Sequence, residues 1–268
     1  MLFRSEGNSA DAESCFRESL GIQKKLLGDG QPGLAITLDN LAFVLREEGK
    51  LDEAETVERQ SLEMQRKIFG PEYPSVATAI NNLGLILAAQ GKTIEAEKLL
   101  REALAQRRKL LGPEHPELAA SLHHLAALLR AENKLDEAGR LEGEALAMRK
   151  NLFGEENLAV AESLDNLALI RQEEHKLAES ESLFQEATAM QKKFLGNDHP
   201  NLAATLNHLD RVLREEVKLS ESEATFRQVL EIRRKHGDAH LSVTASLLEL
   251  TNVPGAKENP ERLEAIRE

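Results

Sequence analysis

Hydrophobic residues recur at helical spacing through most of the chain. The first clear run has residues at positions i, i+3, i+4 and i+7, the spacing of one helical face, namely Leu38, Leu41, Ala42 and Leu45. The run stops at Gly49, and a second helix is predicted to open at Asp52. We expect its inner face to carry Ala54, Val57, Ser61, Met64 and Ile68. The pattern therefore predicts a helix pair, helix A and helix B, joined by a tight turn.

The helix pair recurs with a fixed period. Glycines at a constant spacing of 42 residues follow each predicted helix B, and a last one follows after 41: Gly28, Gly70, Gly112, Gly154, Gly196 and Gly237. Gly70 is expected to close its helix in the left-handed conformation, and Pro71 cannot continue a helix. A period in this range indicates a solenoid, in which each repeat packs only on its neighbours. The predicted fold is all-α, an α-solenoid (right-handed superhelix) of stacked antiparallel helix pairs.

The period sets the predicted boundaries. They are a partial N-terminal repeat (1–28), repeat 1 (29–70), repeat 2 (71–112), repeat 3 (113–154), repeat 4 (155–196), repeat 5 (197–237), and a degenerate repeat with a C-terminal cap (238–268). By this register the residues up to Gly7 are the tail of a helix A, and Cys15 lies buried in a helix B. Since the pattern opens in mid-repeat, we expect the chain to be a piece of a longer protein or a truncated product.

Composition narrows the classes of partner. The net charge is −12 and the pI about 5.3. Nucleic acids and anionic membranes attract Lys and Arg, so neither is expected as a partner. No apolar run is long enough to span a bilayer, and the start has no signal peptide. The single cysteine, Cys15, allows no internal disulfide and favours a reducing, cytoplasmic location.

No motif for catalysis stands out. The chain has no Gly-rich phosphate loop, no GxSxG and no HExxH. His123 and His124 are adjacent and therefore point about 100° apart on a helix. His208 lies two repeats further along, and no Cys or further His is placed to complete a tetrahedral metal site. We expect no enzymatic activity, no cofactor and no metal.

The repeated positions resemble the tetratricopeptide repeat. In repeat 2 the family's pattern is matched by Ile80, Leu83, Gly84, Leu87, Gly91, Ala96, Leu100 and Ala103. The 42-residue spacing, the phrase Asn-Asn-Leu-Gly and the linker Gly-Pro-Glu-His-Pro look like kinesin light chain repeats, and equally like repeats of bacterial multidomain proteins. The resemblance implies a scaffold that binds a protein or peptide in a concave groove lined by the A helices.

The outer stripe of helix A supplies the candidate groove residues. The resemblance implies that Asn at one position holds a ligand's backbone, and the corresponding row is Asn40, Asn82, His124, Asn166 and His208. The adjoining row contributes Asn81 and His123. An apolar floor is predicted from Phe43, Leu85 and Leu169, and arginines that can pair with carboxylates are Arg46 and Arg130, in a row that also holds Arg4 and Arg214.

Other interpretations of these positions stay open. The Asn row can hydrogen-bond the next helix, the apolar floor can pack between repeats, and Arg214 can pair along its own helix. The run from Arg107 to Lys109 is interpreted as charge compensation at a helix end. Two further functions are a regulatory module of a larger signalling or enzyme chain, and self-association through the incomplete N-terminal repeat.

Overall fold

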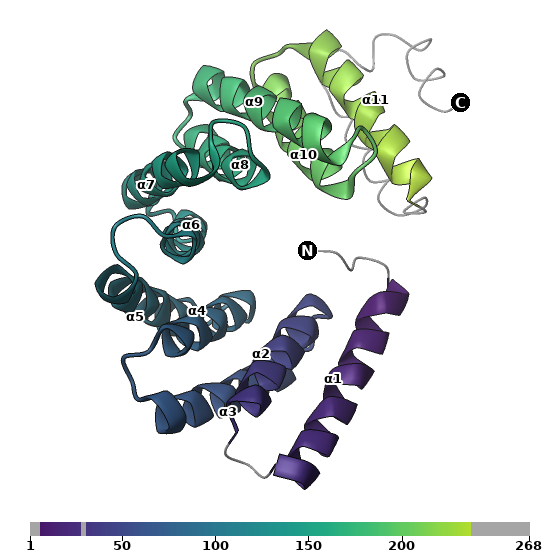
Figure 1. Ribbon diagram of the computed structural model, residues 1–268. Coiled ribbons are helices and arrows are strands. Elements are labelled where there is room, and N and C mark those ends of the chain that lie inside the picture. The colour runs from purple at the N-terminus through teal and green to yellow at the C-terminus, as the bar shows by residue number, and fades with distance from the viewer. Residues whose placement is uncertain (1–5, 28–30, 237–268) are drawn as a thin grey trace. The chain divides into compact units, whose positions relative to one another are not determined.

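The computed structural model describes residues 6–27 and 31–236, and Figure 1 shows them as successive helices. This part of the chain contains no strand. Its helices are α1 (Glu6–Leu27), α2 (Pro32–Glu47), α3 (Leu51–Phe69), α4 (Pro74–Ala89), α5 (Thr93–Leu110), α6 (Pro116–Ala131), α7 (Leu135–Phe153), α8 (Leu158–Glu173), α9 (Leu177–Leu195), α10 (Pro200–Glu215) and α11 (Leu219–Lys235). Gly28, Gly237, Arg4 and the predicted C-terminal cap lie outside the described residues.

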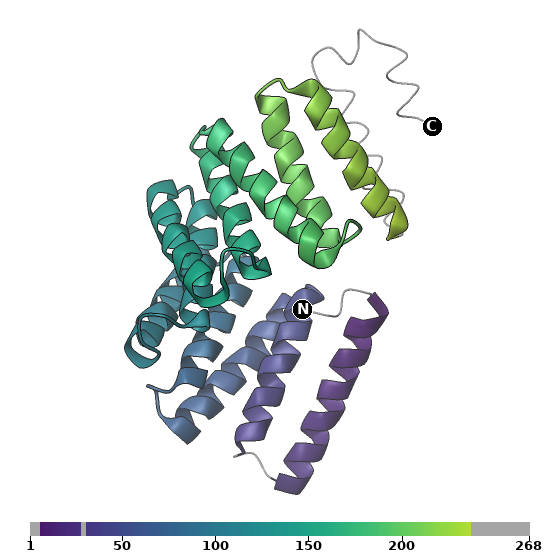
Figure 2. The same ribbon diagram turned by 45° about the horizontal axis from the view of Figure 1, so that its top comes forward.

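Consecutive helices pack as pairs. Helix A of a repeat contacts helix B of the same repeat, as α2 contacts α3 and α4 contacts α5. Figure 2 shows the two members of such a pair side by side and antiparallel. Each helix B also contacts the next helix A, as α3 contacts α4. The predicted all-α solenoid of helix pairs is therefore confirmed.

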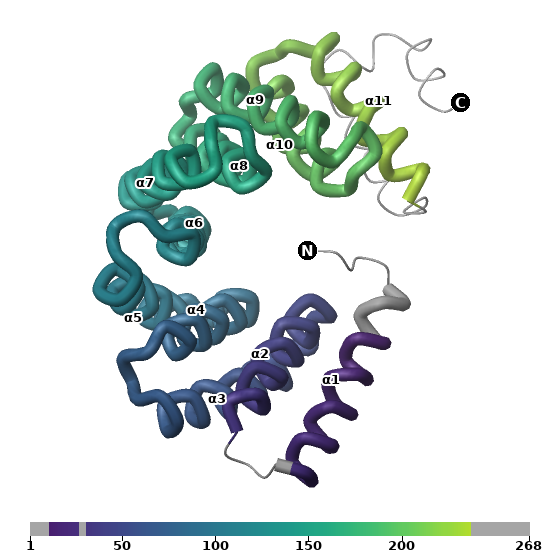
Figure 3. The backbone as a smooth tube through the Cα atoms, viewed as in Figure 1, coloured from purple at the N-terminus to yellow at the C-terminus, as the bar shows by residue number. Residues whose placement is uncertain are grey.

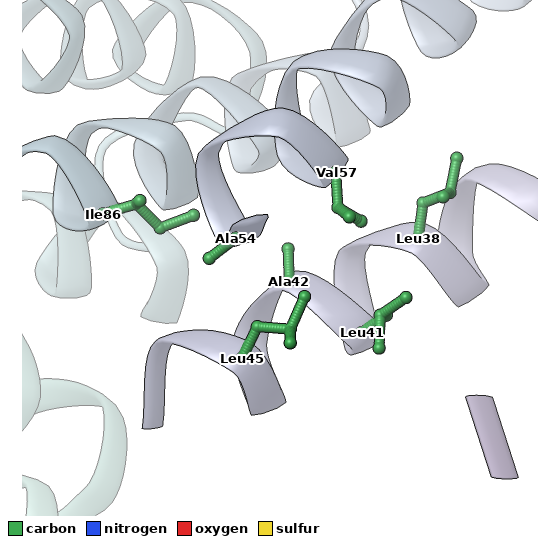
Figure 4. Packing of buried hydrophobic residues seen from close by; sticks show 7 residues of the cluster. All are labelled: Leu38, Leu41, Ala42, Leu45, Ala54, Val57 and Ile86. Carbon is green, nitrogen blue, oxygen red and sulfur yellow. The ribbon is translucent and has the colours of Figure 1, made fainter. Parts of the chain in front are cut away.

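The core of each pair is formed by the periodic apolar residues. In repeat 1, Leu38, Leu41 and Leu45 of α2 meet Ala54 and Val57 of α3, and the next repeat adds Ile86 from α4 (Figure 4). Ala54 is completely buried, because a small side chain at this position lets the two helices approach closely. The helical face predicted from the sequence is thus the buried face.

Proline and glycine mark the ends of the helices. Pro32, Pro74, Pro116 and Pro200 each stand in the first turn of a helix A, where the missing N–H costs no hydrogen bond. Gly70 has φ +84° and ψ 167°, so it is not in the left-handed helical conformation that we expected. This backbone region is open almost only to glycine, which explains why glycine recurs there.

Two expectations for the N-terminal region are wrong. Helix α1 begins at Glu6 and includes Gly7, which the register had placed at the end of a separate helix A. Cys15 is exposed, although its position carries core residues in other repeats. Helix α1 packs only one side on the following repeat, through Phe16 and Leu20. The opposite side, with Cys15, meets no helix A of its own repeat in the described residues.

The described residues form two compact units, divided within α7 between Met148 and Arg149. The N-terminal unit contains α1 to α6, and the C-terminal unit contains α8 to α11. The tube in Figure 3 follows this order of helices from purple to yellow. None of the helices in the described residues combines the length and the apolar character that a membrane crossing requires.

Candidate functional site

The A helices of the N-terminal unit lie closer together than its B helices. Helix α2 contacts α4, and α4 contacts α6, whereas no comparable contact joins α3 to α5. The B helices are instead connected by long charged side chains, such as Arg59 with Glu95. We call the outward side of α2, α4 and α6 the helix-A face of this unit. The predicted site residues of these three helices are Asn40, Phe43, Arg46, Asn81, Asn82, Leu85, His123, His124 and Arg130.

Helix α2 presents the most accessible part of this face. Ile36 is 61% exposed and Phe43 is 49% exposed, and Asn40 stands exposed between them at helical spacing. No hydrogen bond to the Asn40 amide is present in the described part of the chain. The Arg46 guanidinium lies over the Phe43 ring, 5.1 Å from its centroid, and pairs with Glu47 at 3.1 Å. The side chains therefore combine apolar surface with an available amide.

Helix α4 contributes less than the sequence predicted. Asn82 and Leu85 are half-buried, so each keeps some accessible surface. Asn81 is only 3% exposed, and its Oδ1 lies 3.1 Å from His124 Nδ1 on α6. The amide of Asn81 therefore joins two repeats. This polar group is therefore already used within the protein.

Two histidines of α6 are likewise engaged within the protein. His123 Nδ1 lies 3.0 Å from a carboxylate oxygen of Glu142, which is completely buried in α7. Since His124 contacts Asn81, both rings hold neighbouring helices together. Arg130 is half-buried at the end of the same helix. In the described residues, no group of three His, Cys, Asp or Glu side chains converges as metal ligands.

The predicted site residues of the C-terminal unit are more buried. Asn166 is 6% and Leu169 8% exposed. His208 Nδ1 lies 3.4 Å from Asp165 Oδ1, and its ring packs 5.7 Å from that of Phe184. His208 also lines an open pocket of about 270 Å³ between α10 and α11. The other residues that line this pocket are Pro200, Ala203, Ala204, Asn207, Ile232, Arg233 and His236.

The arginine row also forms internal contacts. Arg214 pairs with Asp210, one turn earlier on α10. Arg211 donates to Gln172 Oε1 at 2.6 Å, and Gln172 donates to Glu215. Pairing of Arg214 along its own helix was one of the open interpretations, and the ion pair with Asp210 confirms it.

Two acidic side chains lie beneath the α2 part of the face. Burial raises the pKa of Asp39 to about 6, although Ser61 and Gln65 donate hydrogen bonds to its carboxylate. Burial also raises the pKa of Glu58 well above its ordinary value, and the nearby Asp39 charge adds to this shift. Neither group was identified as important from the sequence, because a Glu in an amphipathic helix is usually solvent-exposed.

The sequence analysis also missed a buried set of hydrogen bonds between repeats, made by Arg107 and called the polar bracket below. Arg107 is only 3% exposed, and it donates to Ser121 Oγ at 2.6 Å and to Thr78 Oγ1 at 3.0 Å. It therefore joins α4, α5 and α6. Arg108 instead pairs with Glu144, and Lys109 with Glu72. All three residues stand in the last turn of α5, as the interpretation of helix-end compensation requires, and each also has a partner of its own.

A recurring pair of polar positions in the sequence could have indicated the role of Arg107. Side chains 14 residues apart join the end of a helix B to the next helix A in four places: Gln23 with Thr37, Arg107 with Ser121, Arg149 with Ser163, and Gln191 with Thr205. A polar residue at each of these positions, in step with the repeat, is visible in the sequence.

This architecture of stacked helix pairs defines the class of helical-repeat solenoids. The tetratricopeptide repeat family model matches residues 1–67, 75–151 and 157–235, so the chain belongs to that family. Repeats of this family generally mediate protein–protein interaction, and its members are typically non-enzymatic scaffolds. A search of curated proteins returned no match.

Solved structures of kinesin light chain-like repeats are similar to this chain. One is the structure of a putative kinesin light chain from Podosopora anserina, described as nearly identical TPR-like repeats. Its sequence is 27% identical to this chain, and the TM-score is 0.63. The match covers 78% of this chain and 99% of that one. BtubC (BKLC) from P. vanneervenii is 18% identical with a TM-score of 0.66, and the match covers 88% and 92% of the two chains. The second likeness shows the fold alone.

Proposed function

We propose that this chain is a non-enzymatic scaffold that binds a peptide, or a peptide segment of a partner protein, on the helix-A face of the N-terminal unit. One observation carries the proposal. On α2, the exposed Ile36 and Phe43 stand on either side of Asn40, whose amide has no hydrogen bond in the described residues. An amide donates and accepts at once, which suits a peptide backbone, and the flanking apolar groups suit side-chain anchors.

The contacts of the other row members support α2 as the centre of binding. His124 and His208 each hydrogen-bond the preceding repeat, and Asn166 is buried. Asn82 and Leu85 on α4 remain partly accessible and extend the face by one repeat. Bound peptide would therefore run from α2 towards α4, with Arg46 and Arg130 as contacts for carboxylates. The other predicted groove residues would act mainly by positioning the helices.

The test uses a peptide selected on the immobilised full chain from a random display library. Phe43→Ala is expected to weaken its binding about tenfold or more, because aromatic anchors dominate such interfaces. Asn40→Ala should weaken it as well. The matched control is Ile94→Ala, which truncates a residue that is 87% exposed at the start of α5, away from this face.

Two outcomes would contradict the proposal. One is an unchanged affinity of the Phe43→Ala and Asn40→Ala variants while circular dichroism shows normal helix content. The other is an equal loss in Ile94→Ala. An Asn82→Ala, Arg130→Glu double variant tests how far the site extends: unchanged binding would confine it to α2.

A second candidate function is self-association through α1. Ile22 is 50% and Leu26 77% exposed on this helix, and Cys15 is exposed as well. Residues at the same register in other repeats are buried, for example Met190 and Ile232. An exposed apolar side of a helix favours pairing. A mass that stays monomeric in sedimentation over a wide concentration range would exclude it. A regulatory role within a larger protein and a cytoplasmic location stay predictions.

A further inference from the structure

Position 58 of helix α3 carries a charged group where the other repeats bury mostly apolar ones. The residues at the same register are Leu100, Glu142, Phe184 and Phe226. All are buried, and Glu58 itself has no exposed surface. Neither carboxylate oxygen of Glu58 has a hydrogen bond of good geometry. A buried carboxyl group that is poorly hydrogen-bonded costs free energy, and that cost rises sharply if the group is ionised.

Repeat 3 shows how the same position is satisfied elsewhere. There Glu142 lies 3.0 Å from His123 Nδ1, so a group able to carry a positive charge faces the buried carboxylate. Asp39 stands in repeat 1 where repeat 3 has His123. Repeat 1 thus opposes two acids across the interface of α2 and α3, where repeat 3 opposes an acid and a histidine.

The neighbouring helices provide little positive charge or hydrogen bonding to offset the burial of Asp39 and Glu58. From α2, Arg46 acts on Glu58 only weakly and already pairs with Glu47. From α4, the uncharged Asn82 amide partly offsets the burial of Glu58. Helix α1 faces α2 with Gln23, which bonds Thr37 and not Asp39. In the described part of the chain, no cation acts on Asp39, whose carboxylate is held only by Ser61 and Gln65.

We infer that the Asp39–Glu58 pair makes the packing of α2 against α3 and α4 depend on a bound proton. While at least one carboxyl is neutral, the interface holds no opposed like charges. When both lose their protons, two negative charges face each other in a buried site, and repulsion with desolvation loosens α2. The two groups titrate as a pair rather than separately.

The direction of the pH effect follows from the raised pKa values. An acid with a folded-state pKa above its unfolded value stabilises the fold below the unfolded value. That contribution is lost as the pH rises through the folded-state pKa. For Asp39 the loss begins near 3.8 and is largely complete at about 6, and Glu58 extends it to higher pH. Repeat 1 should therefore be tightest in mild acid and loosen towards alkaline pH.

The consequence for binding rests on the proposed function. Asn40 follows Asp39 directly, and Ile36 and Phe43 lie on the same helix, so a looser α2 would present the peptide with a less ordered surface. Affinity would then fall as the pH rises. Loosening of α2 itself is a property of the helix packing, and it can be measured without any ligand.

The test is hydrogen exchange of the full chain at about pH 5 and about pH 8, expressed as protection factors that correct for intrinsic exchange rates. Protection of α2 and α3 is expected to fall about tenfold or more at the higher pH, since one pKa unit corresponds to a factor of ten. Helices α10 and α11, with Phe226 at the same register, serve as the internal control and should not show this fall.

Two variants decide whether the carboxyl pair is the cause. Glu58→Phe introduces the residue that repeats 4 and 5 already carry, and Asp39→Asn keeps an oxygen to accept from Ser61. Each should remove most of the pH-dependent loss, so the inference stays testable if one fails to fold. Equal protection of α2 at both pH values, or an undiminished fall in the variants, would overturn it. Peptide affinity that is insensitive to pH, with α2 loosening intact, would count against the proposed site alone.

Discussion

Val217 occupies a backbone conformation that suits glycine far better than a β-branched side chain. Its φ is +62°, in the turn between α10 and α11. The same turn position holds Gly49 and Gly91 in repeats 1 and 2, then Asn133 and His175. All five have a positive φ, because the turn geometry is common to every repeat. A β-branched residue there is strained.

Replacement of Val217 by glycine should therefore stabilise the protein. Relief of the strain is worth about 1–3 kcal/mol, and the greater freedom of glycine in the unfolded chain offsets part of it, leaving about 1 kcal/mol. Val217 is 71% exposed, so little packing is lost. Thermal unfolding followed by circular dichroism should show a higher midpoint. The reverse change at the equivalent turn, Gly49→Val, should lower it; a lower midpoint for Val217→Gly would contradict the strain.

The sequence predicted where residues lie on a helix better than what they contact. The face of Leu38, Leu41 and Leu45 followed from spacing alone, because burial repeats with the helical period. The exposure of Cys15 depends on which helices surround α1 rather than on the residue itself, so spacing alone gave the wrong result. The bond between Asn81 and His124 could not be predicted, because it requires knowing how adjacent repeats stack.

Adjacent positions at the end of helix α5 have very different environments. Arg107 is buried and bonds groups on α4 and α6, while Arg108 pairs with Glu144 at the surface. Both are arginines in the last turn of the helix, where a positive charge is favourable in either case. A comparison of the two positions therefore separates the effect of the buried hydrogen bonds between repeats from the effect of a positive charge at the helix end.

Alanine at the two positions should separate these effects. Arg107→Ala leaves Ser121 and Thr78 without a donor in a buried site and should cost about 2–3 kcal/mol. Arg108→Ala removes an exposed ion pair and should cost less than about 1 kcal/mol. Denaturant unfolding of the two variants gives the comparison. Equal losses would mean that the polar bracket contributes no more than a surface pair.

Contacts between elements were only partly predictable. The helix pairs, their order and the proline-marked starts followed from the period, because each repeat is one supersecondary unit. The ion pairs between successive B helices, such as Arg101 with Glu137, were missed. They join residues 36 or 37 positions apart, slightly less than the repeat length, so a search for charges along one helix does not reveal them.

Stability in a stack of repeats is expected to be distributed by nearest neighbours rather than by a single core. The hydrophobic clusters draw their residues from one repeat or from adjacent repeats. One joins Phe184 of α9 with Ala168 of α8 and Leu209 and Leu213 of α10, and it includes no residue of the N-terminal unit. Loss of one cluster should therefore weaken its own neighbourhood first.

Phe184→Ala tests this distribution. Phe184 has no exposed surface, and truncation of such a side chain costs about 3–5 kcal/mol through lost burial and the cavity left behind. Hydrogen exchange of the full chain should show a large loss of protection in α8 to α10. Helices α2 to α4 should lose much less, because none of their residues belongs to this cluster. Val57→Ala in the N-terminal unit should give the reverse pattern. A uniform loss across both units in either variant would mean that the described repeats unfold as one cooperative body.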